Sequence, residues 1–272
     1  MNNILDIGED EDDKNLYQFY KNSKPYFSKL LSTFILLFYF FEYFFFTDDD
    51  EGISELTKKL YFSVINRYPL CTDRRLQLWR FMTSSFLHLN IEHLFNNLIL
   101  LLPISYYFDV FYKFKILSVI ILFISFLSNF IFYYYYPYSS IIGCSHLVFG
   151  LFGALLSDYF LNKKFNSFFY ICKLLVPLLC ISLDILSYYF KRNDNNGYIV
   201  HWGGFFIGFI TGLIFLYDII DKKYNKKIRV FAFIILFFII SFLLHNYIFN
   251  WPPKVNDNCC YLLLSNQTII NC

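Results

Sequence analysis

Charged residues are scarce in this sequence: they make up 16% of the 272 residues, while 57% are hydrophobic and 24% are aromatic. A soluble globular domain of this length normally carries much more charge and fewer apolar residues. The low charge therefore argues against a soluble protein. We expect lipid to be the solvent for most of the chain.

Further absences exclude other classes of protein. The net charge is only +2, and no basic run alternates with exposed stacking residues, so the composition argues against nucleic-acid binding. The seven cysteines have neither the paired spacing of a zinc site nor the density of a disulfide scaffold. Residues 1–28 lack an apolar signal-peptide core and carry an acidic run over 9–13, which predicts a solvated cytosolic tail.

Long apolar segments dominate the rest of the chain. Each is long enough to cross, or nearly cross, about 30 Å of hydrocarbon. A backbone in lipid must satisfy its own hydrogen bonds, and the alternating pattern of a β-barrel is missing, so these segments should be helices. We predict an all-α polytopic membrane helical bundle with seven spans: 30–46, 91–108, 116–136, 145–161, 168–190, 198–217 and 230–249.

The basic residues of the short connections predict the orientation of the bundle. Lysines at 113–115, at 163–164 and within 221–229 fall on one side if the N-terminus is cytosolic. The longer connection 47–90 is also basic and would lie on the opposite side, but acidic residues at 48–51 offset part of its charge. This orientation places Cys71, Cys259, Cys260, Cys272 and the glycosylation sequon 266–268 outside the cytosol, so we expect a membrane of the secretory pathway.

Three stretches combine polar and small residues within apolar surroundings, which is where membrane proteins concentrate function. In the stretch 79–97, His93 and Asn97 are four residues apart and share one helix face. The second stretch, 143–153, contains Ser145. The third begins at His201 and continues with glycines at every fourth position, Gly204, Gly208 and Gly212.

The glycine series predicts how two of the spans pack. Small residues at every fourth position allow two membrane helices to approach closely. His201 precedes Gly204 by three residues and points toward the same partner helix, and Phe149 and Gly153 continue the face of Ser145 on its own helix. A close crossing of these helices would bring the Ser145 hydroxyl within reach of the His201 ring, as a nucleophile and its general base require.

The position of Ser145 at the start of its helix adds a second catalytic element. Gly143 and the loop before it interrupt the apolar run, so Ser145 should begin a helix. Its backbone N–H and the positive end of the helix would then point to the place where an oxyanion forms. His93 and Asn97 are candidate side-chain donors to the same oxygen.

Structural alternatives exist for each of these residues. A membrane-span serine often bonds back to its own helix, and His201 can be a polar contact between two helices. His93 and Asn97 can cap a helix or contact water. His88 is expected to brace the first loop, and Cys144 to fill space.

Two aspartates also lie in apolar spans. Asp158 is close to a span end, from which its carboxylate can reach the interface. For Asp184 three positions remain open: the bundle interior, a pair with Lys173, or the outer surface.

The motifs together resemble those of the rhomboid family in order and spacing, over about 30–217. They are the Trp79-Arg80 pair, the histidines before Asn97, Gly143-x-Ser145, and His201-x-x-Gly204-x-x-x-Gly208. The resemblance implies cleavage of single-span transmembrane proteins by a Ser145–His201 dyad, without metal, cofactor or catalytic aspartate. It also implies an oxyanion hole made of His93, Asn97 and the Ser145 amide, and a Phe149 ring stacked on His201.

The resemblance divides the chain into a cytosolic tail (1–28), a six-span rhomboid domain (29–220), a basic linker with a seventh span (221–249) and a C-terminal tail outside the cytosol (250–272). One departure is His146, which stands where the family has glycine after the serine. Consecutive helical residues point about 100° apart, so the ring should leave the face of Ser145 and pack against a neighbouring span or turn toward the water cavity. We expect its bulk to push the two crossing helices slightly apart or to displace the adjacent loop. The alternative function is therefore an inactive pseudoprotease that binds membrane proteins.

A transporter would show inverted repeats or paired broken helices, and the sequence shows neither.

Overall fold

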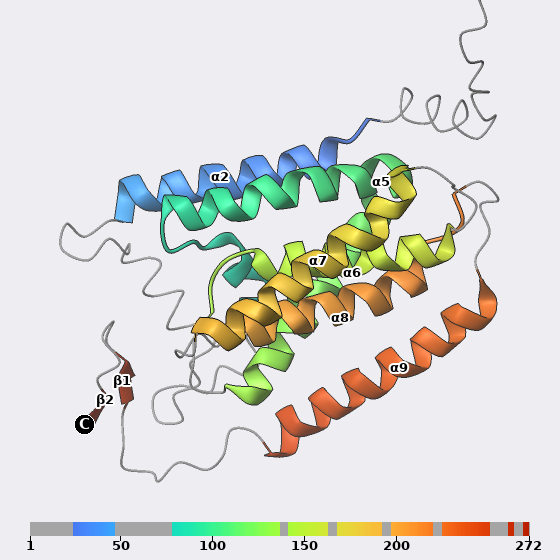
Figure 1. The fold of residues 1–272 in the computed structure, drawn as a ribbon. Coiled ribbons are helices and arrows are strands. Elements are labelled where there is room, and N and C mark those ends of the chain that lie inside the picture. The colour runs from blue at the N-terminus through green and yellow to red at the C-terminus, as the bar shows by residue number, and fades with distance from the viewer. Residues whose placement is uncertain are drawn as a thin grey trace, which may run out of the picture.

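The computed structural model describes residues 24–46, 78–136, 141–162, 168–191, 197–219, 225–250, 261–263 and 269–271. Most of the predicted tail, the connection 47–77, the four cysteines predicted to lie outside the cytosol and the sequon fall outside these ranges. Within them the predicted helical bundle is confirmed. The main helices are α2 (Tyr26–Phe46), α5 (Ile91–Tyr135), α6 (Ser145–Leu161), α7 (Phe168–Lys191), α8 (Gly197–Phe215) and α9 (Lys226–His245), as Figure 1 shows.

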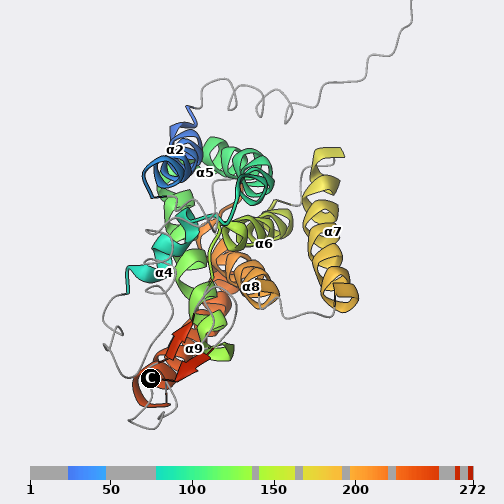
Figure 2. The same cartoon turned by 90° about the vertical axis from the view of Figure 1, so that its left-hand side faces the viewer.

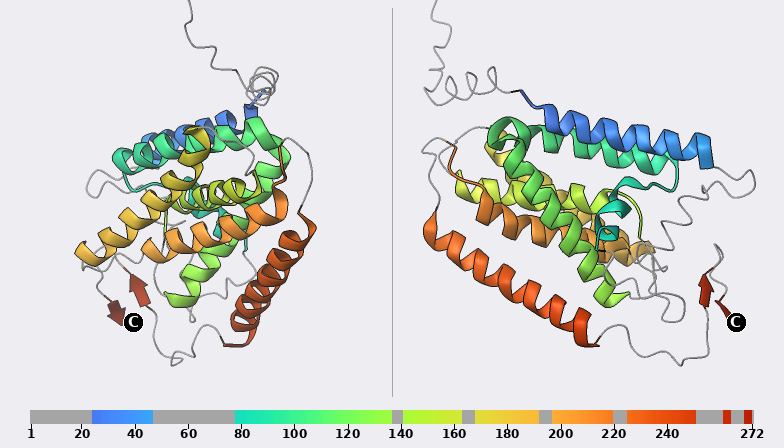
Figure 3. Two further views of the ribbon diagram at one scale, coloured as in Figure 1. Left: turned by 45° about the vertical axis from the view of Figure 1, so that its right-hand side comes forward. Right: turned by 180° about the vertical axis from the view of Figure 1, so that it is seen from behind.

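Each of the seven predicted spans lies mainly or wholly within one of these helices. The long helix α5 contains two of them, since 45 residues at 1.5 Å each reach about twice the thickness of the hydrocarbon core. Its backbone leaves helical geometry at Lys113, with φ 65° and ψ 161°, between the two predicted spans. The two halves of α5 run in different directions on either side of this break (Figure 3).

Four described helices are long and apolar enough to cross a membrane: α5, α7, α8 and α9, the last continued by the π-helical turn η2 (Asn246–Asn250). Helices α2 and α6 are apolar but shorter over their described residues. The chain is therefore an integral membrane protein. Two short helices, α4 (Arg80–Thr83) and η1 (Ser84–Phe86), precede α5, and two antiparallel strands, β1 (Tyr261–Leu263) and β2 (Ile269–Asn271), lie near the C-terminus.

Helix α6 occupies the middle of the bundle, with α8 and α5 against it and α7 at one side (Figure 2). Helices α6 and α8 approach so closely that the glycines at their crossing have no room for a Cβ atom. A Cβ atom built on Gly208 would lie 1.8 Å from the Gly150 carbonyl oxygen, and one on Gly153 would lie 1.9 Å from the Phe205 carbonyl oxygen. The close crossing predicted from the glycine series is thus present.

The C-terminal part of α6 carries the buried Asp158, for which the sequence-based expectation was wrong. Asp158 is fully buried and does not reach the interface. Lys173 of α7 pairs with it at 2.7 Å, so Lys173 is also not the partner of Asp184. The correction has a physical reason: α5 and α7 cover this end of α6 with polar side chains, and Asp158 accepts hydrogen bonds from Tyr107, Tyr112 and Asn162.

Candidate active site

Ser145 and His201 meet where α6 crosses α8. Ser145 is the first residue of α6, and His201 lies in the first turns of α8. The His201 Nε2 atom is 2.8 Å from the Ser145 Oγ atom. This approach depends on Gly204, because a Cβ atom there would lie 2.5 Å from the His146 carbonyl oxygen. The pair has the hydrogen-bond geometry of a nucleophile and its general base.

The His201 ring is held on a face and on both nitrogens. The Phe149 ring stacks on it, with centroids 4.5 Å apart and an interplanar angle of 9°. The Nδ1 atom, which points away from Ser145, is 3.0 Å from Oδ1 of Asp184. The other oxygen of Asp184 accepts a hydrogen bond from Nε1 of Trp202 at 2.9 Å. These contacts leave the ring little freedom to rotate.

The loop before Ser145 lies against the N-terminal end of α5. Gly143 has a φ of +109°, a conformation that residues with a Cβ atom rarely adopt. A Cβ atom there would be 2.7 Å from the His93 ring and 3.6 Å from Nδ2 of Asn97. The N–H of Gly143 donates to the Ser84 carbonyl oxygen at 3.0 Å and so ties this loop to the short helices before α5.

Asn97 is 6% exposed, yet its Nδ2 atom has no hydrogen-bond partner among the described residues, and the same holds for Nδ1 of His93. Buried polar atoms in native proteins are nearly always paired, so an unpaired donor calls for an explanation. Both residues flank Gly143, two positions before Ser145. An oxygen atom bound beside Ser145 would give Asn97 an acceptor.

His88 holds the end of the first loop in place through its hydrogen bonds, as the sequence predicted. Its Nε2 atom lies 3.5 Å from Sγ of the buried Cys144, and its Nδ1 atom lies 3.4 Å from the Phe86 carbonyl oxygen. Burial, followed by the charge of neighbouring His93, lowers the pKa of His88 to about 4. His88 is therefore neutral at physiological pH, which suits a structural role.

The His146 ring leaves the face of Ser145 and packs against a neighbouring element, as predicted, but α6 and α8 still cross closely and the expected separation of the two helices is absent. The His146 side chain is 1% exposed and leaves the α6–α8 crossing, with Nε2 at 2.9 Å from Oγ of Ser85. Ser85 in turn bonds to Ser125 at 3.1 Å. The reason is rotational: successive helical residues point about 100° apart, so the residue after Ser145 faces the η1 side of α6. The ring joins η1 to α6 and α5.

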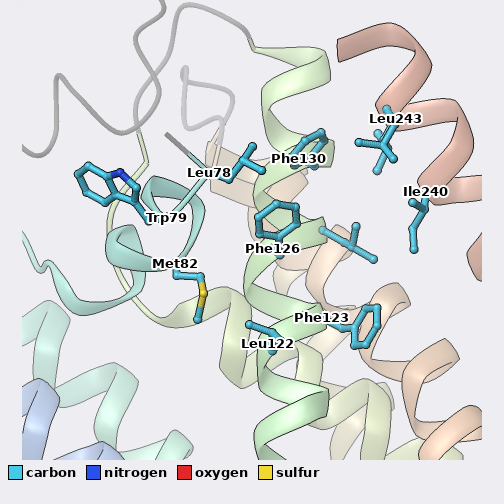
Figure 4. A pocket seen from close by; sticks show the side chains of 11 residues that line it. Leu78, Trp79, Met82, Leu122, Phe123, Phe126, Phe130, Ile240 and Leu243 are labelled. Carbon is cyan, nitrogen blue, oxygen red and sulfur yellow. The ribbon is translucent and has the colours of Figure 1, made fainter. Parts of the chain in front are cut away.

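One cavity lies apart from the Ser145–His201 pair. An apolar cavity of about 420 Å³ opens between α5, α9 and the start of α4, and Figure 4 shows Trp79, Met82 and Phe126 among its lining residues. Neither Ser145 nor His201 lines it. Within the described parts of the chain, no group of three His, Cys, Asp or Glu side chains is placed to hold a metal ion.

The sequence missed the partner of His201. Asp184 was left between three positions, and the resemblance implied a pair without an aspartate. The helix α7 carries Asp184 to the rim of the site, where its side chain is 10% exposed against 21% for His201. The available signal was an ionisable residue within an apolar span, but the signal did not indicate which neighbour it faces.

Comparison with known proteins agrees with the motif pattern. The family model described as the Rhomboid domain matches residues 75–218, which is more than half of the chain. Rhomboid-related protein 1 of Caenorhabditis elegans is 27% identical over 158 residues, covering 56% of this chain and 44% of the relative. The chain therefore spans less than half the length of that relative. The matched family region contains Ser145, His201, His93, Asn97 and Asp184.

Proposed function

Because this chain belongs to the rhomboid family, we propose that it is an intramembrane serine endopeptidase that cleaves transmembrane-anchored proteins through Ser145 and His201. The substrates are single-span proteins held in the same bilayer, and the reaction needs no cofactor. We place the N-terminus in the cytosol and the protein in a membrane of the secretory pathway. The observation that carries the proposal is the 2.8 Å approach of His201 Nε2 to Ser145 Oγ.

The chemistry follows from that approach. His201 Nε2 takes the proton of the Ser145 hydroxyl as Oγ attacks the carbonyl carbon of the scissile peptide bond. The tetrahedral oxyanion lies near the N-terminus of α6 and receives hydrogen bonds from the Ser145 amide, His93 and Asn97. The protonated His201 then gives the proton to the leaving amine, and water hydrolyses the acyl-enzyme by the same steps in reverse order.

The unpaired Asn97 amide supports the assignment of an oxyanion hole. A donor that has no partner among the described residues can form its bond when the oxyanion appears, so the stabilisation is specific to the transition state. Asn97→Ala should lower kcat by about 10- to 1000-fold, as the loss of one oxyanion donor does.

The test uses a fluorophosphonate probe, which reacts only with an activated serine. Purified wild-type protein in detergent should be labelled and should cleave a single-span reporter. Ser145→Ala and His201→Ala should each abolish both activities while the protein stays folded, and their effects should not add. Ser182→Ala is the matched control, because Ser182 is exposed on α7 and its hydroxyl bonds to the Leu178 carbonyl of its own helix.

Two results would contradict the proposal. Labelling that persists in Ser145→Ala would place the nucleophile elsewhere. A folded wild-type protein that neither reacts with the probe nor cleaves any reporter would indicate a pseudoprotease that binds membrane proteins.

A further inference from the structure

A carboxylate from a third helix completes the arrangement around His201. Asp184 lies on α7, which flanks the α6–α8 crossing, and both of its oxygens are engaged. One faces His201 Nδ1 at 3.0 Å, and the other accepts from the indole N–H of Trp202 at 2.9 Å. The Trp202 bond fixes the orientation of the carboxylate toward His201.

This carboxylate determines which nitrogen of His201 carries the proton. A neutral imidazole has one N–H donor and one acceptor nitrogen, and an ionised carboxylate can only accept. Asp184 therefore places the proton on Nδ1, which leaves Nε2 as the acceptor facing the Ser145 hydroxyl. A general base at Nε2 requires this tautomer.

We infer that Asp184 is a positioning residue for His201, so that the hydrolytic unit is a Ser145–His201–Asp184 triad rather than a pair. The inference rests on the proposed function. Asp184 holds the tautomer and the ring orientation, and its negative charge stabilises the imidazolium that forms when Ser145 attacks. In soluble serine proteases, exchanging the corresponding aspartate for asparagine lowers kcat by about 10⁴-fold because the tautomer is wrong.

A tether is the competing role: Asp184 would merely hold α7 against α8 through Trp202. The two roles predict different behaviour for Asp184→Asn in the presence and absence of the indole. The Trp202 N–H can only donate, so it holds the amide oxygen of the Asp184→Asn variant and turns the amide NH₂ toward His201. His201 Nδ1 must then accept, and the proton moves to Nε2, where it blocks the base.

Removing the indole should partly reverse this defect. Asp184→Asn alone should lower kcat and the rate of fluorophosphonate labelling together by about 100-fold or more, with little change in KM. Trp202→Phe alone should lower kcat by less than about 10-fold. In the double variant the amide is free to turn its oxygen toward Nδ1–H, so we expect kcat about 10-fold above that of Asp184→Asn.

A tether predicts the opposite order, since losing both bonds would loosen α7 further and make the double variant the slower enzyme. That order would overturn the inference, as would an Asp184→Asn variant that reacts at the wild-type rate. If the wild-type protein itself is not labelled, the proposed function fails instead, and the two failures are distinguishable.

The tautomer can also be read without a variant at Asp184. Of the five histidines, His201 is identified in the ¹⁵N spectrum by the signal that His201→Gln removes. We expect a protonated Nδ1 and an unprotonated Nε2 in the wild-type protein. A proton on Nε2 would overturn the inference even if Asp184→Asn fails to fold.

Discussion

Two aspartates in apolar helices, Asp158 and Asp184, differ in how completely the protein satisfies them. Asp158 is fully buried, and three hydrogen-bond donors and the Lys173 ammonium group converge on it from α5, α7 and the residue after α6. Asp184 is partly exposed and receives two donors, one of which is a histidine whose other nitrogen faces Ser145. All the groups around the Asp158 carboxylate serve to bind it. The Asp184 carboxylate is instead linked through His201 to the Ser145 hydroxyl.

The difference separates a charge with a structural role from one that lies beside the proposed nucleophile and base. A charge that is buried with all its partners stabilises one arrangement of helices and has no capacity left for a substrate. The Ser145 end of the site keeps unused capacity in the Asn97 amide and in the exposed part of the His201 ring. Both regions depend on α6, since Ser145 and Asp158 are 13 residues, or about 20 Å, apart on the same helix.

The largest effect is expected at the structural aspartate. Asp158→Asn should destabilise the protein by about 3–5 kcal/mol, because Lys173 would remain buried without its carboxylate. Thermal unfolding in detergent measures the change. The same exchange at Asp184 should alter stability by less than about 1 kcal/mol while lowering kcat.

A double-mutant cycle sharpens this contrast. Adding Lys173→Gln to Asp158→Asn removes the ammonium group that has lost its carboxylate and should recover part of the lost stability. If the exchanges at Asp158 and Asp184 lower the free energy of unfolding equally, the two carboxylates contribute equally to stability, and the contrast drawn above is wrong.

The next largest effect is expected at the crossing of α6 and α8. Gly208→Ala places a methyl group 1.8 Å from the Gly150 carbonyl oxygen and must shift α8 away from α6. A displacement of 1 Å costs about 100-fold in rate, so reporter cleavage should fall by that order. Gly203→Ala is the matched control on the same helix, because its methyl group would meet Ile131 at 3.4 Å or more. Cleavage by Gly203→Ala should stay within about threefold of wild type, and equal losses in both variants would contradict the packing argument.

The smallest effect is expected at His146. His146→Ala removes the bond to Ser85 and leaves a cavity between η1 and α6, at a cost of about 2 kcal/mol. His146→Gln can keep a donor near Ser85 and should lose less, as the unfolding temperature will show. Cleavage should not rise in either variant, and a clear rise would restore the view that the ring crowds the site.

The elements that the sequence predicted are those that depend on local spacing. A run of about 20 apolar residues defines a span, and glycines at every fourth position define a face that another helix can approach. For this reason the positions of Gly204 and Gly208, the start of α6 at Ser145 and the approach of His201 followed from the residues alone.

The partners of polar residues could not be predicted in the same way. Which neighbour Asp184 or His146 faces depends on the rotation of α7 and on the position of η1, and neither leaves a periodic signal in the sequence. The incorrect expectations for Asp158 and His146 have this common origin. In both cases a side chain expected to reach the interface or to crowd the site is buried against residues more than 40 positions away or on another helix.

The sequence by itself determined that this is a polytopic helical membrane protein of the rhomboid family, with a serine at a helix start and a histidine on a glycine-lined helix. Hydrophobic length and small-residue spacing are properties of short segments, so they can be read without the fold. The tertiary structure alone decided that Asp184 faces His201 and that Asp158 is saturated by Tyr107, Tyr112, Asn162 and Lys173. Hydrogen bonds between helices depend on the relative rotation and depth of whole elements, which no local pattern encodes.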